Sequence, residues 1–208
     1  MADGLFITVE GIEGVGKTTQ LDQIRQALEA AGHAVQVTRE PGGTQTGEEI
    51  REILLHGTSQ AISGLTELLL IFSARAQHLE EVIRPALGQG RYVLCDRFTD
   101  ATYAYQGGGR GMDRQQIGVL EALVQKGLKP DLTILYDAPV EVGLQRARNR
   151  SNADRFESET TRFFDQVRQA YLAMAADEPG RFLVVDANQP PDLVWNSTLA
   201  GLRERGIC

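Results

Sequence analysis

The sequence predicts an α/β protein: a five-stranded parallel sheet with helices on both faces. Short apolar runs typical of strands alternate with helical segments along the 208 residues. These runs are continuously apolar, which is typical of strands that are buried on both faces of a sheet. A glycine-rich turn at residues 11–16 joins the first strand to the first helix. Together these observations favour a parallel sheet over separate helical and strand regions.

The elements follow one another with recognisable boundaries. Apolar residues recur at helical spacing after the glycine turn, and Gly32 is expected to end that helix. Three glycines at residues 107–109 are expected to form a flexible turn. We find no repeat and no linker, so residues 1–208 are expected to form one domain. The expected strands are residues 5–10, 34–38, 92–95, 132–136 and 182–185, and the expected helices are 17–31, 47–55, 65–87, 99–105, 113–125, one from 139, 158–176 and one ending near 203.

Composition excludes several classes of protein. The net charge of −7 disfavours a nucleic-acid partner, because binding to a phosphate backbone needs a basic surface. The longest apolar run, around residues 68–72, is too short to cross a bilayer. No basic segment precedes an apolar one at the N-terminus, and Cys95 and Cys208 are the only cysteines. The sequence therefore predicts a cytoplasmic protein with no membrane partner and no disulfide.

Residues 11–18 match the phosphate-binding loop G-x-x-x-x-G-K-[ST] in its required context of strand, turn and helix. The glycines allow several backbone N–H groups to point into one concavity, at the positive end of the following helix. Lys17 is expected to reach the β- and γ-phosphates, and the Thr18 hydroxyl to bind Mg²⁺. The residues expected to bind ATP are Gly11, Ile12, Glu13, Gly14, Val15, Gly16, Lys17 and Thr18.

Three expected strands end in aspartate: Asp96, Asp137 and Asp186. Ligands of parallel sheets bind beyond the carboxyl ends of the strands, so all three are eligible. The turns that follow Asp137 and Asp186 explain those residues without a function. Asp96 is followed by Arg97, and an acid for Mg²⁺ beside a cation for phosphate is what phosphoryl transfer requires. A structural ion pair is the simpler alternative for this pair.

Arginine is concentrated around the same region. Arg39 ends the second strand, and Arg146, Arg148, Arg150 and Arg155 fill one polar segment. As a set these four suit a lid at about residues 146–157, although each alone is also explained by a solvated helix end. No dedicated general base is visible. An acceptor that is already an ionised phosphate needs none, whereas an alcohol does.

Several motifs taken together resemble bacterial thymidylate kinase, and the resemblance covers essentially the whole chain. Beside the phosphate-binding loop, they are Thr-Arg-Glu-Pro-Gly-Gly-Thr at 38–44, Phe-Ser-Ala-Arg-Ala-Gln-His at 72–78, Asp-Arg-Phe at 96–98, Ala-Tyr-Gln-Gly-Gly-Gly-Arg at 104–110 and the segment 146–157. The loop alone indicates only nucleotide binding, whereas the combination is much more specific.

The resemblance implies a nucleoside-monophosphate-kinase-like fold with a five-stranded parallel sheet and an arginine-rich lid. It also implies transfer of the γ-phosphoryl group of ATP to dTMP, with Mg²⁺, giving dTDP and ADP for dTTP synthesis and DNA replication. A homodimer is implied as well.

Residue roles are carried over by position. The resemblance implies that Phe72 stacks on thymine and that Arg75 hydrogen-bonds the base, with Thr102 and Gln106 near the base and the acceptor phosphate. It implies that Arg39 and Arg97 hold the dTMP phosphate, and that Glu13 and Tyr103 lie near the sugar. Lys17, Arg97 and a lid arginine are the implied catalytic residues, and Thr18 and Asp96 the implied metal-binding residues. Without the resemblance, a core position on an apolar helix face is the better interpretation of Phe72.

One loop position sorts this chain within the family. Some members carry a basic residue after the acidic one, and here that position is Gly14. The missing cation is then expected from the lid, as Arg155 or Arg150. Two other functions remain open: a kinase for another monophosphate, which residues 72, 75 and 106 argue against, and a nucleotide-dependent switch, for which no Asn-Lys-x-Asp motif is found.

Overall fold

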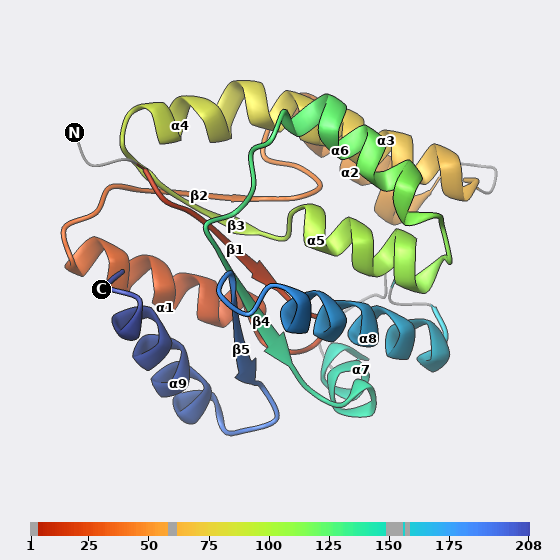
Figure 1. Ribbon diagram of the computed structural model, residues 1–208. Coiled ribbons are helices and arrows are strands. Elements are labelled where there is room, and N and C mark those ends of the chain that lie inside the picture. Colours follow the sequence, from red (N-terminus) through yellow and green to blue (C-terminus); the bar gives the residue numbers. More distant parts are fainter. Residues whose placement is uncertain (1–3, 58–61, 149–155, 157–158) are drawn as a thin grey trace.

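The computed structural model describes residues 4–57, 62–148, 156 and 159–208. Its centre is one five-stranded sheet in which every pairing is parallel, in the order β2-β3-β1-β4-β5 (Figure 1). This confirms the predicted fold class. The strands are β1 (Phe6–Glu10), β2 (Val35–Arg39), β3 (Tyr92–Asp96), β4 (Leu132–Asp137) and β5 (Phe182–Asp186).

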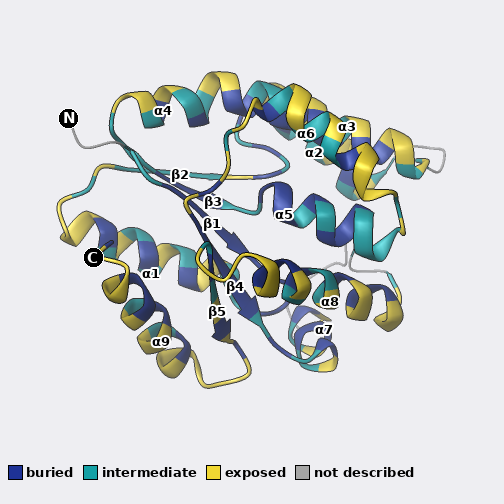
Figure 2. Ribbon diagram, in the orientation of Figure 1, coloured by how far each residue is buried: buried dark blue, intermediate teal, exposed yellow. Residues whose placement is uncertain are grey.

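The register of the strands brings residues of the expected site together at the carboxyl ends of the strands. Val9 of β1 pairs with Asp96 of β3, and Asp96 also pairs with Arg39 of β2. All five residues of β1 are buried, and Figure 2 shows that the middle of the sheet is buried with it. The carboxyl ends of β1, β2 and β3 therefore lie side by side, next to the loop that leaves β1.

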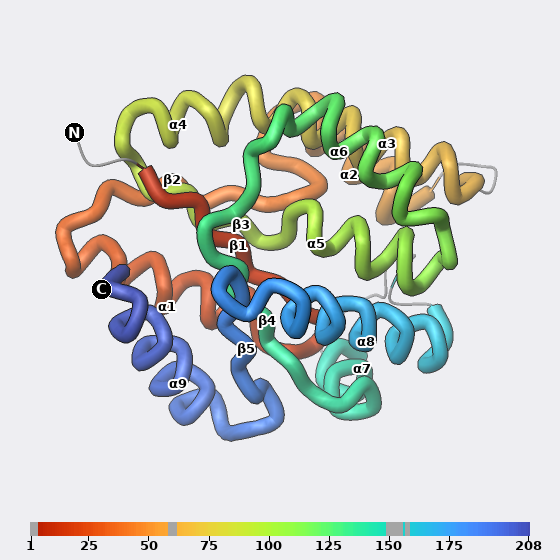
Figure 3. The backbone as a smooth tube through the Cα atoms, in the orientation of Figure 1, coloured from red at the N-terminus to blue at the C-terminus, as the bar shows by residue number. Residues whose placement is uncertain are grey.

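Helices cover both faces of the sheet (Figure 3). On one face α1 (Lys17–Ala30) packs on β1 and β3, and α9 (Pro191–Glu204) packs on β5 and α1. On the other face α8 (Thr161–Asp177) packs on β4 and β5, and α4 (Arg84–Gly88) packs on β3. Among the described residues, no helix is both long and apolar enough to cross a membrane.

The helix predicted at residues 65–87 is present as one continuous rod with a change of winding. It consists of α3 (Gly64–His78), a π-helical turn η1 (Leu79–Ile83) and α4. The Ser63 hydroxyl caps its start by accepting a hydrogen bond from the Thr66 amide. Helix α2 (Gln45–His56) packs beside α3 and is capped in the same way by Thr44.

The glycines at 107–109 differ from the prediction. They are helical, because α5 (Thr99–Thr102) continues into a π-helical segment η2 (Tyr103–Gly109). A Cβ on Gly108 would lie 2.8 Å from the Ala170 Cβ, and a Cβ on Gly109 would lie 2.4 Å from the Phe163 ring. These glycines therefore allow α8 to pack closely on η2. The other helices are α6 (Arg114–Gln125) and α7 (Val140–Arg148).

Candidate active site

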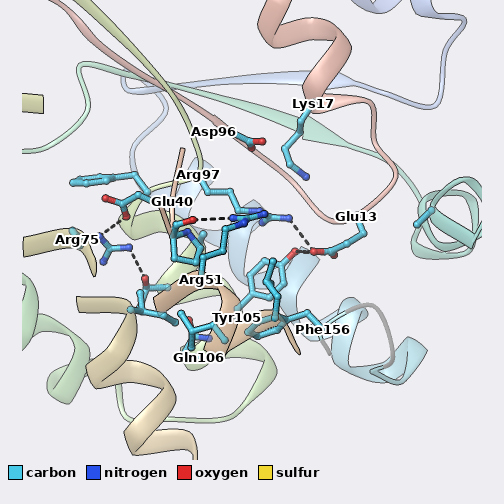
Figure 4. A pocket seen from close by; sticks show the side chains of 18 of the residues that line it. Glu13, Lys17, Glu40, Arg51, Arg75, Asp96, Arg97, Tyr105, Gln106 and Phe156 are labelled. Carbon is cyan, nitrogen blue, oxygen red and sulfur yellow. Dashed lines mark hydrogen bonds and ion pairs between the residues drawn. The ribbon is translucent and has the colours of Figure 1, made fainter. Parts of the chain in front are cut away.

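A cavity of about 240 Å³ opens beyond the carboxyl ends of β1, β2 and β3; we call it the central cavity (Figure 4). Its lining comes from the phosphate-binding loop, α2, α3, the end of β3, and the helical run α5–η2. Phe156, from the segment between α7 and α8, also lines it. Residues from most of the predicted motifs therefore meet in one place.

The loop at one end of the central cavity holds Lys17 against its own backbone. The Lys17 ammonium donates hydrogen bonds to the carbonyl oxygens of Gly11 (3.0 Å) and Ile12 (2.8 Å). Burial, together with the nearby Arg97 guanidinium, lowers the pKa of Lys17 to about 8, although Asp96 and Glu13 act in the opposite direction. An incoming polyphosphate would supply a negatively charged partner for this ammonium.

Gly14 is held in a position that only glycine fits. Its φ is +76°, and a Cβ would lie 1.9 Å from the carbonyl oxygen of Gly143 in α7. A Cβ on Gly143 would in turn lie 2.6 Å from the carbonyl oxygen of Glu13. The loop and α7 are therefore packed backbone against backbone, which leaves no room for a basic side chain at position 14.

Asp96 is the strand-end aspartate whose environment fits a metal. Its Oδ1 atom is buried and has no hydrogen-bond partner among the residues that the structure describes. By contrast, Asp137 accepts two hydrogen bonds from Arg168, and Asp186 accepts from the Asn188 amide and the Gln189 side chain. A buried, unpartnered carboxylate oxygen beside a phosphate-binding loop suits a hydrated divalent cation. Thr18, the other expected metal-binding residue, is exposed in the first turn of α1.

Arg97 projects from the end of β3 into the central cavity. Its φ of +67° lies in the left-handed region, which is uncommon for a residue with a side chain. Its guanidinium pairs with Glu13 at 3.0 Å, lies 4.7 Å from the centre of the Tyr105 ring, and donates to the Tyr171 hydroxyl at 3.2 Å. The Tyr105 hydroxyl donates to both oxygens of Glu13 at 2.8 Å. Glu13 and Arg97 are therefore held together with little freedom.

Glu10 and Tyr171 support Arg97 from behind, and sequence reasoning missed both. The Tyr171 hydroxyl donates to Glu10 at 2.6 Å, and the Phe98 amide donates to the other Glu10 oxygen at 2.7 Å. Complete burial raises the pKa of Glu10 to about 7, while Arg97 opposes that rise. Tyr171 lies 161 residues from Glu10 in the sequence, so no local motif marks the pair.

The second strand's arginine does not reach the central cavity. Arg39 is 53% exposed and pairs with Glu48 at 2.8 Å. Arg51, in the second turn of α2, lines the cavity instead and donates to the Pro41 carbonyl at 2.8 Å. Burial lowers the pKa of Arg51, and Arg39 and Arg97 add to that effect. The signal available in the sequence was the helical face of α2, where Leu54 and Leu55 also line the cavity.

Arg75 enters the far end of the central cavity from α3, and it is 1% exposed. Its Nε donates to Glu40 at 2.7 Å and its Nη2 to the Thr102 hydroxyl at 3.0 Å, while the buried Nη1 has no partner in the described part of the chain. The guanidinium lies within 5.0 Å of the ring centres of Phe72 and Phe98. The guanidinium thus provides a fixed hydrogen-bond donor next to two aromatic rings.

Phe72 does not line the central cavity. It packs with Leu68 and Ile117 in a small core between α3 and α6, and its neighbour Ile71 lines the cavity. Successive helical residues point about 100° apart, so a shift of one position changes the surface that a side chain contacts. The core position considered for Phe72 is therefore the one observed.

Tyr103 also faces away from the central cavity. Its hydroxyl donates to Glu121 at 2.6 Å, and its ring borders a second pocket with Asp100 and Arg181. Residues 101, 102, 105 and 106 line the central cavity, which is one helical face, and position 103 is off that face. Thr102 and Gln106 therefore line the cavity, and Tyr105 takes the place next to Glu13.

The lid arginines are only partly within the described chain. Arg146 donates to the Ala187 carbonyl at 2.8 Å, and Arg148 is the last residue of α7. Arg150 and Arg155, the two expected catalytic lid residues, lie outside the described residues.

The sheet order, the phosphate-binding loop after β1 and the paired acid and arginine after β3 define a nucleoside-monophosphate kinase of the P-loop class. The sequence model of the thymidylate kinase family matches residues 9–197. The chain therefore belongs to the thymidylate kinase family.

Individual relatives agree. The chain is 59% identical over 187 residues to a thymidylate kinase of Pseudomonas savastanoi, covering 90% of this chain and 89% of that protein. It is 57% identical over 191 residues to a thymidylate kinase of Alcanivorax borkumensis, covering 92% of each. The crystal structure of thymidylate kinase from Ehrlichia chaffeensis superposes with a TM-score of 0.77 at 32% identity, covering 96% of this chain and 99% of that one.

Proposed function

We propose that the protein transfers the γ-phosphoryl group of ATP to dTMP, giving dTDP and ADP, as one cytoplasmic catalytic domain over residues 1–208 with a lid at about 146–157. The observation that carries this proposal is the central cavity itself. A phosphate-binding loop at one end, arginines in the middle and a buried donor at the far end match a triphosphate, an acceptor phosphate and a base in line.

The phosphate-donor end uses Lys17 and the loop amides. When ATP binds, the Lys17 ammonium exchanges the Gly11 and Ile12 carbonyls for phosphate oxygens. The Thr18 hydroxyl and, through water, the unpartnered oxygen of Asp96 would hold Mg²⁺. Bound there, the ion would offset the negative charge of the phosphates. Arg150 or Arg155 would add positive charge from the lid.

The acceptor end needs positioning more than proton transfer. Arg97 and Arg51 both line the cavity, and we assign the clamp on the dTMP phosphate to this pair in place of Arg97 and Arg39. Two guanidinium groups match a phosphate dianion in charge and geometry. Because that dianion is already a nucleophile, holding it in line with the γ-phosphoryl group supplies most of the catalysis. We assign the contact with the sugar to Glu13, which Arg97 and Tyr105 hold in position.

The test is a coupled assay of ADP release with a panel of monophosphates: dTMP, dUMP, dCMP, dGMP and AMP. Stimulation by dTMP above all others is the expected result. Preference for a purine monophosphate, or ADP release that no acceptor stimulates, would contradict the proposal.

Arg51 of α2 and Arg39 of β2 provide a paired test. We expect Arg51→Ala to raise the KM for dTMP about 10- to 100-fold, because a charge-assisted hydrogen bond is lost. Arg39→Ala should change it less than about twofold, because an exposed ion pair contributes little. Steady-state kinetics on both variants decide the matter. The opposite ranking would return the phosphate clamp to Arg39.

We also propose that two copies of the chain associate through α2, α3 and α6. Of the seven large apolar side chains that are exposed among the described residues, five lie on these packed helices, and Val119 and Leu123 are 67% and 69% exposed. They are Ile53, Leu65, Leu69, Val119 and Leu123. Such a patch on a protein surface marks an interface.

Charge placed in this patch should disrupt association. The variant Leu123→Glu is expected to shift the mass measured by light scattering from that of a dimer to that of a monomer. Leu193→Glu, which changes an exposed leucine on α9, is the matched control and should leave the mass unchanged. A monomeric wild-type protein would overturn the dimer proposal.

A further inference from the structure

The amide group of Gln106 is fixed from behind by Glu67. Glu67 lies on α3 and is 1% exposed, and its Oε1 accepts a hydrogen bond from Gln106 Nε2 at 2.7 Å. Gln106 itself is buried and lines the central cavity. The contact joins α3 to η2 across 39 residues of sequence. It is outside the phosphate-transfer machinery described above.

This contact determines which end of the amide faces Glu67. An ionised carboxylate only accepts hydrogen bonds, whereas a glutamine side chain donates at its nitrogen and accepts at its oxygen. Arg110 lies beside the same carboxylate, with its Nε and Nη2 at 3.4 and 3.5 Å, so Glu67 has a cation next to it. The nitrogen of Gln106 must therefore face Glu67.

The oxygen of Gln106 is left as an acceptor. It has no partner among the described residues, and the residue borders the cavity. At the same end of the cavity, Arg75 has a buried Nη1, which can only donate and has no partner within residues 4–57, 62–148, 156 and 159–208. This end thus offers one fixed donor and one fixed acceptor.

That pair distinguishes pyrimidines by their hydrogen-bonding edge. Thymine and uracil carry a carbonyl oxygen at C4 and an N–H at N3, which match a donor and an acceptor. Cytosine carries an amino group at C4 and an unprotonated N3, which is the reverse pattern. Cytosine at this place would face a donor with its amino group and an acceptor with its N3 lone pair, and unmatched buried polar groups are costly.

We propose that Glu67 is a specificity-determining positioning residue: by holding the Gln106 amide in one orientation, it makes the cavity select bases with an N–H at N3 over cytosine. The inference rests on the proposed function, because it requires the base to lie against Gln106 and Arg75. Glu67 acts through Gln106 and does not touch the nucleotide.

The decisive variant is Glu67→Gln. A glutamine can present either end of its own amide, so Gln106 is free to turn and offer a donor to cytosine. We expect the ratio of kcat/KM for dTMP over dCMP to fall at least about tenfold, with the change in KM for both nucleotides rather than in kcat or in the KM for ATP. Glu121→Gln is the matched control. It makes the same substitution at a carboxylate that accepts from Tyr103 outside the cavity, and should leave the ratio unchanged.

Two further measurements separate the possible failures. Gln106→Leu should raise the KM for dTMP, and adding Glu67→Gln to it should change the ratio no further. If Gln106→Leu leaves the KM unchanged, the base does not lie there and the proposed placement of dTMP is wrong. If it raises the KM but Glu67→Gln leaves the ratio as in the wild type, the role of Glu67 is wrong while the proposed function stands. Should Glu67→Gln not fold, Glu67→Asp, which is one methylene shorter, is expected to lower the ratio in the same direction, and an unchanged ratio would overturn the inference.

Discussion

Lys17→Met is expected to lower kcat about 10³-fold while the protein stays folded. Methionine keeps the length of the side chain but removes the only cation of the loop. That cation otherwise stabilises the negative charge that develops on the transferring phosphoryl group. The loss of two hydrogen bonds to the Gly11 and Ile12 carbonyls should affect stability little, because the loop conformation is set by its glycines and by Gly143. Single-turnover phosphorylation of dTMP measures the effect, and thermal unfolding checks the fold.

Lys129→Met is the matched control, because Lys129 borders the second pocket and not the central cavity. Its kcat should equal that of the wild type. A Lys17→Met enzyme with kcat within about tenfold of the wild type would remove Lys17 from the mechanism, since the loss of one oriented donor ordinarily costs more.

The same lysine predicts a pH dependence. The pKa of Lys17 is lowered to about 8 in the free protein, so its charge is present below that pH and lost above it. The affinity for ATP should therefore fall as the pH rises through 8. Bound phosphates favour the ammonium, so kcat at saturating ATP should persist to higher pH. Binding of ATP to Lys17→Met should lack this dependence, and an equal decline in both proteins would assign it to another group.

The fold could be predicted because its signals are local. Buried parallel strands require continuous apolar runs, and the phosphate-binding loop requires glycines at fixed positions, as at Gly14. The motifs also indicated correctly which segments meet around one cavity. What they could not indicate is the direction of individual side chains, since this depends on how each helix is rotated against its neighbours.

Three pairs of residues illustrate the point. Arg51 rather than Arg39, Ile71 rather than Phe72, and Tyr105 rather than Tyr103 border the central cavity. In each pair, the residue that lines the cavity is close in sequence to the expected residue or has the same type of side chain. Packing decides which of the two lines the cavity. Phe72 contacts Ile117 on α6, and Tyr103 contacts Glu121 on the same helix. Both contacts depend on a helix more than 15 residues further along the chain, which local spacing does not encode.

The Glu10–Tyr171 pair shows a second limit. Glu10 reads as the last residue of a strand and Tyr171 as an apolar position in a late helix, yet the two join at 2.6 Å behind Arg97. Only the packing of α8 over the sheet brings them together. The residues that orient a catalytic group are thus less visible in a sequence than the group itself.

Arg97→Ala is expected to lower kcat/KM for dTMP about 10³-fold, because Arg97 is a firmly held cation that lines the central cavity. Its guanidinium is fixed by Glu13, Tyr105 and Tyr171. Removing it leaves Glu13 as an uncompensated acid beside two phosphate groups, so attraction is replaced by repulsion. The fall should appear in kcat as well as in KM, because the same guanidinium holds the acceptor and lies near Lys17 and Asp96 at the donor end.

Arg97→Lys separates charge from geometry. A lysine restores one positive charge but cannot hold Glu13, Tyr171 and a phosphate oxygen with a planar fork, so we expect it to recover about tenfold of the loss and no more. Arg168→Lys is the control, since Arg168 makes a two-point contact with Asp137 outside the central cavity and its kinetics should match the wild type. Full recovery by Arg97→Lys would mean that Arg97 acts as a point charge. Its fixed orientation between Glu13, Tyr105 and Tyr171 would then serve the fold rather than the transfer of phosphate.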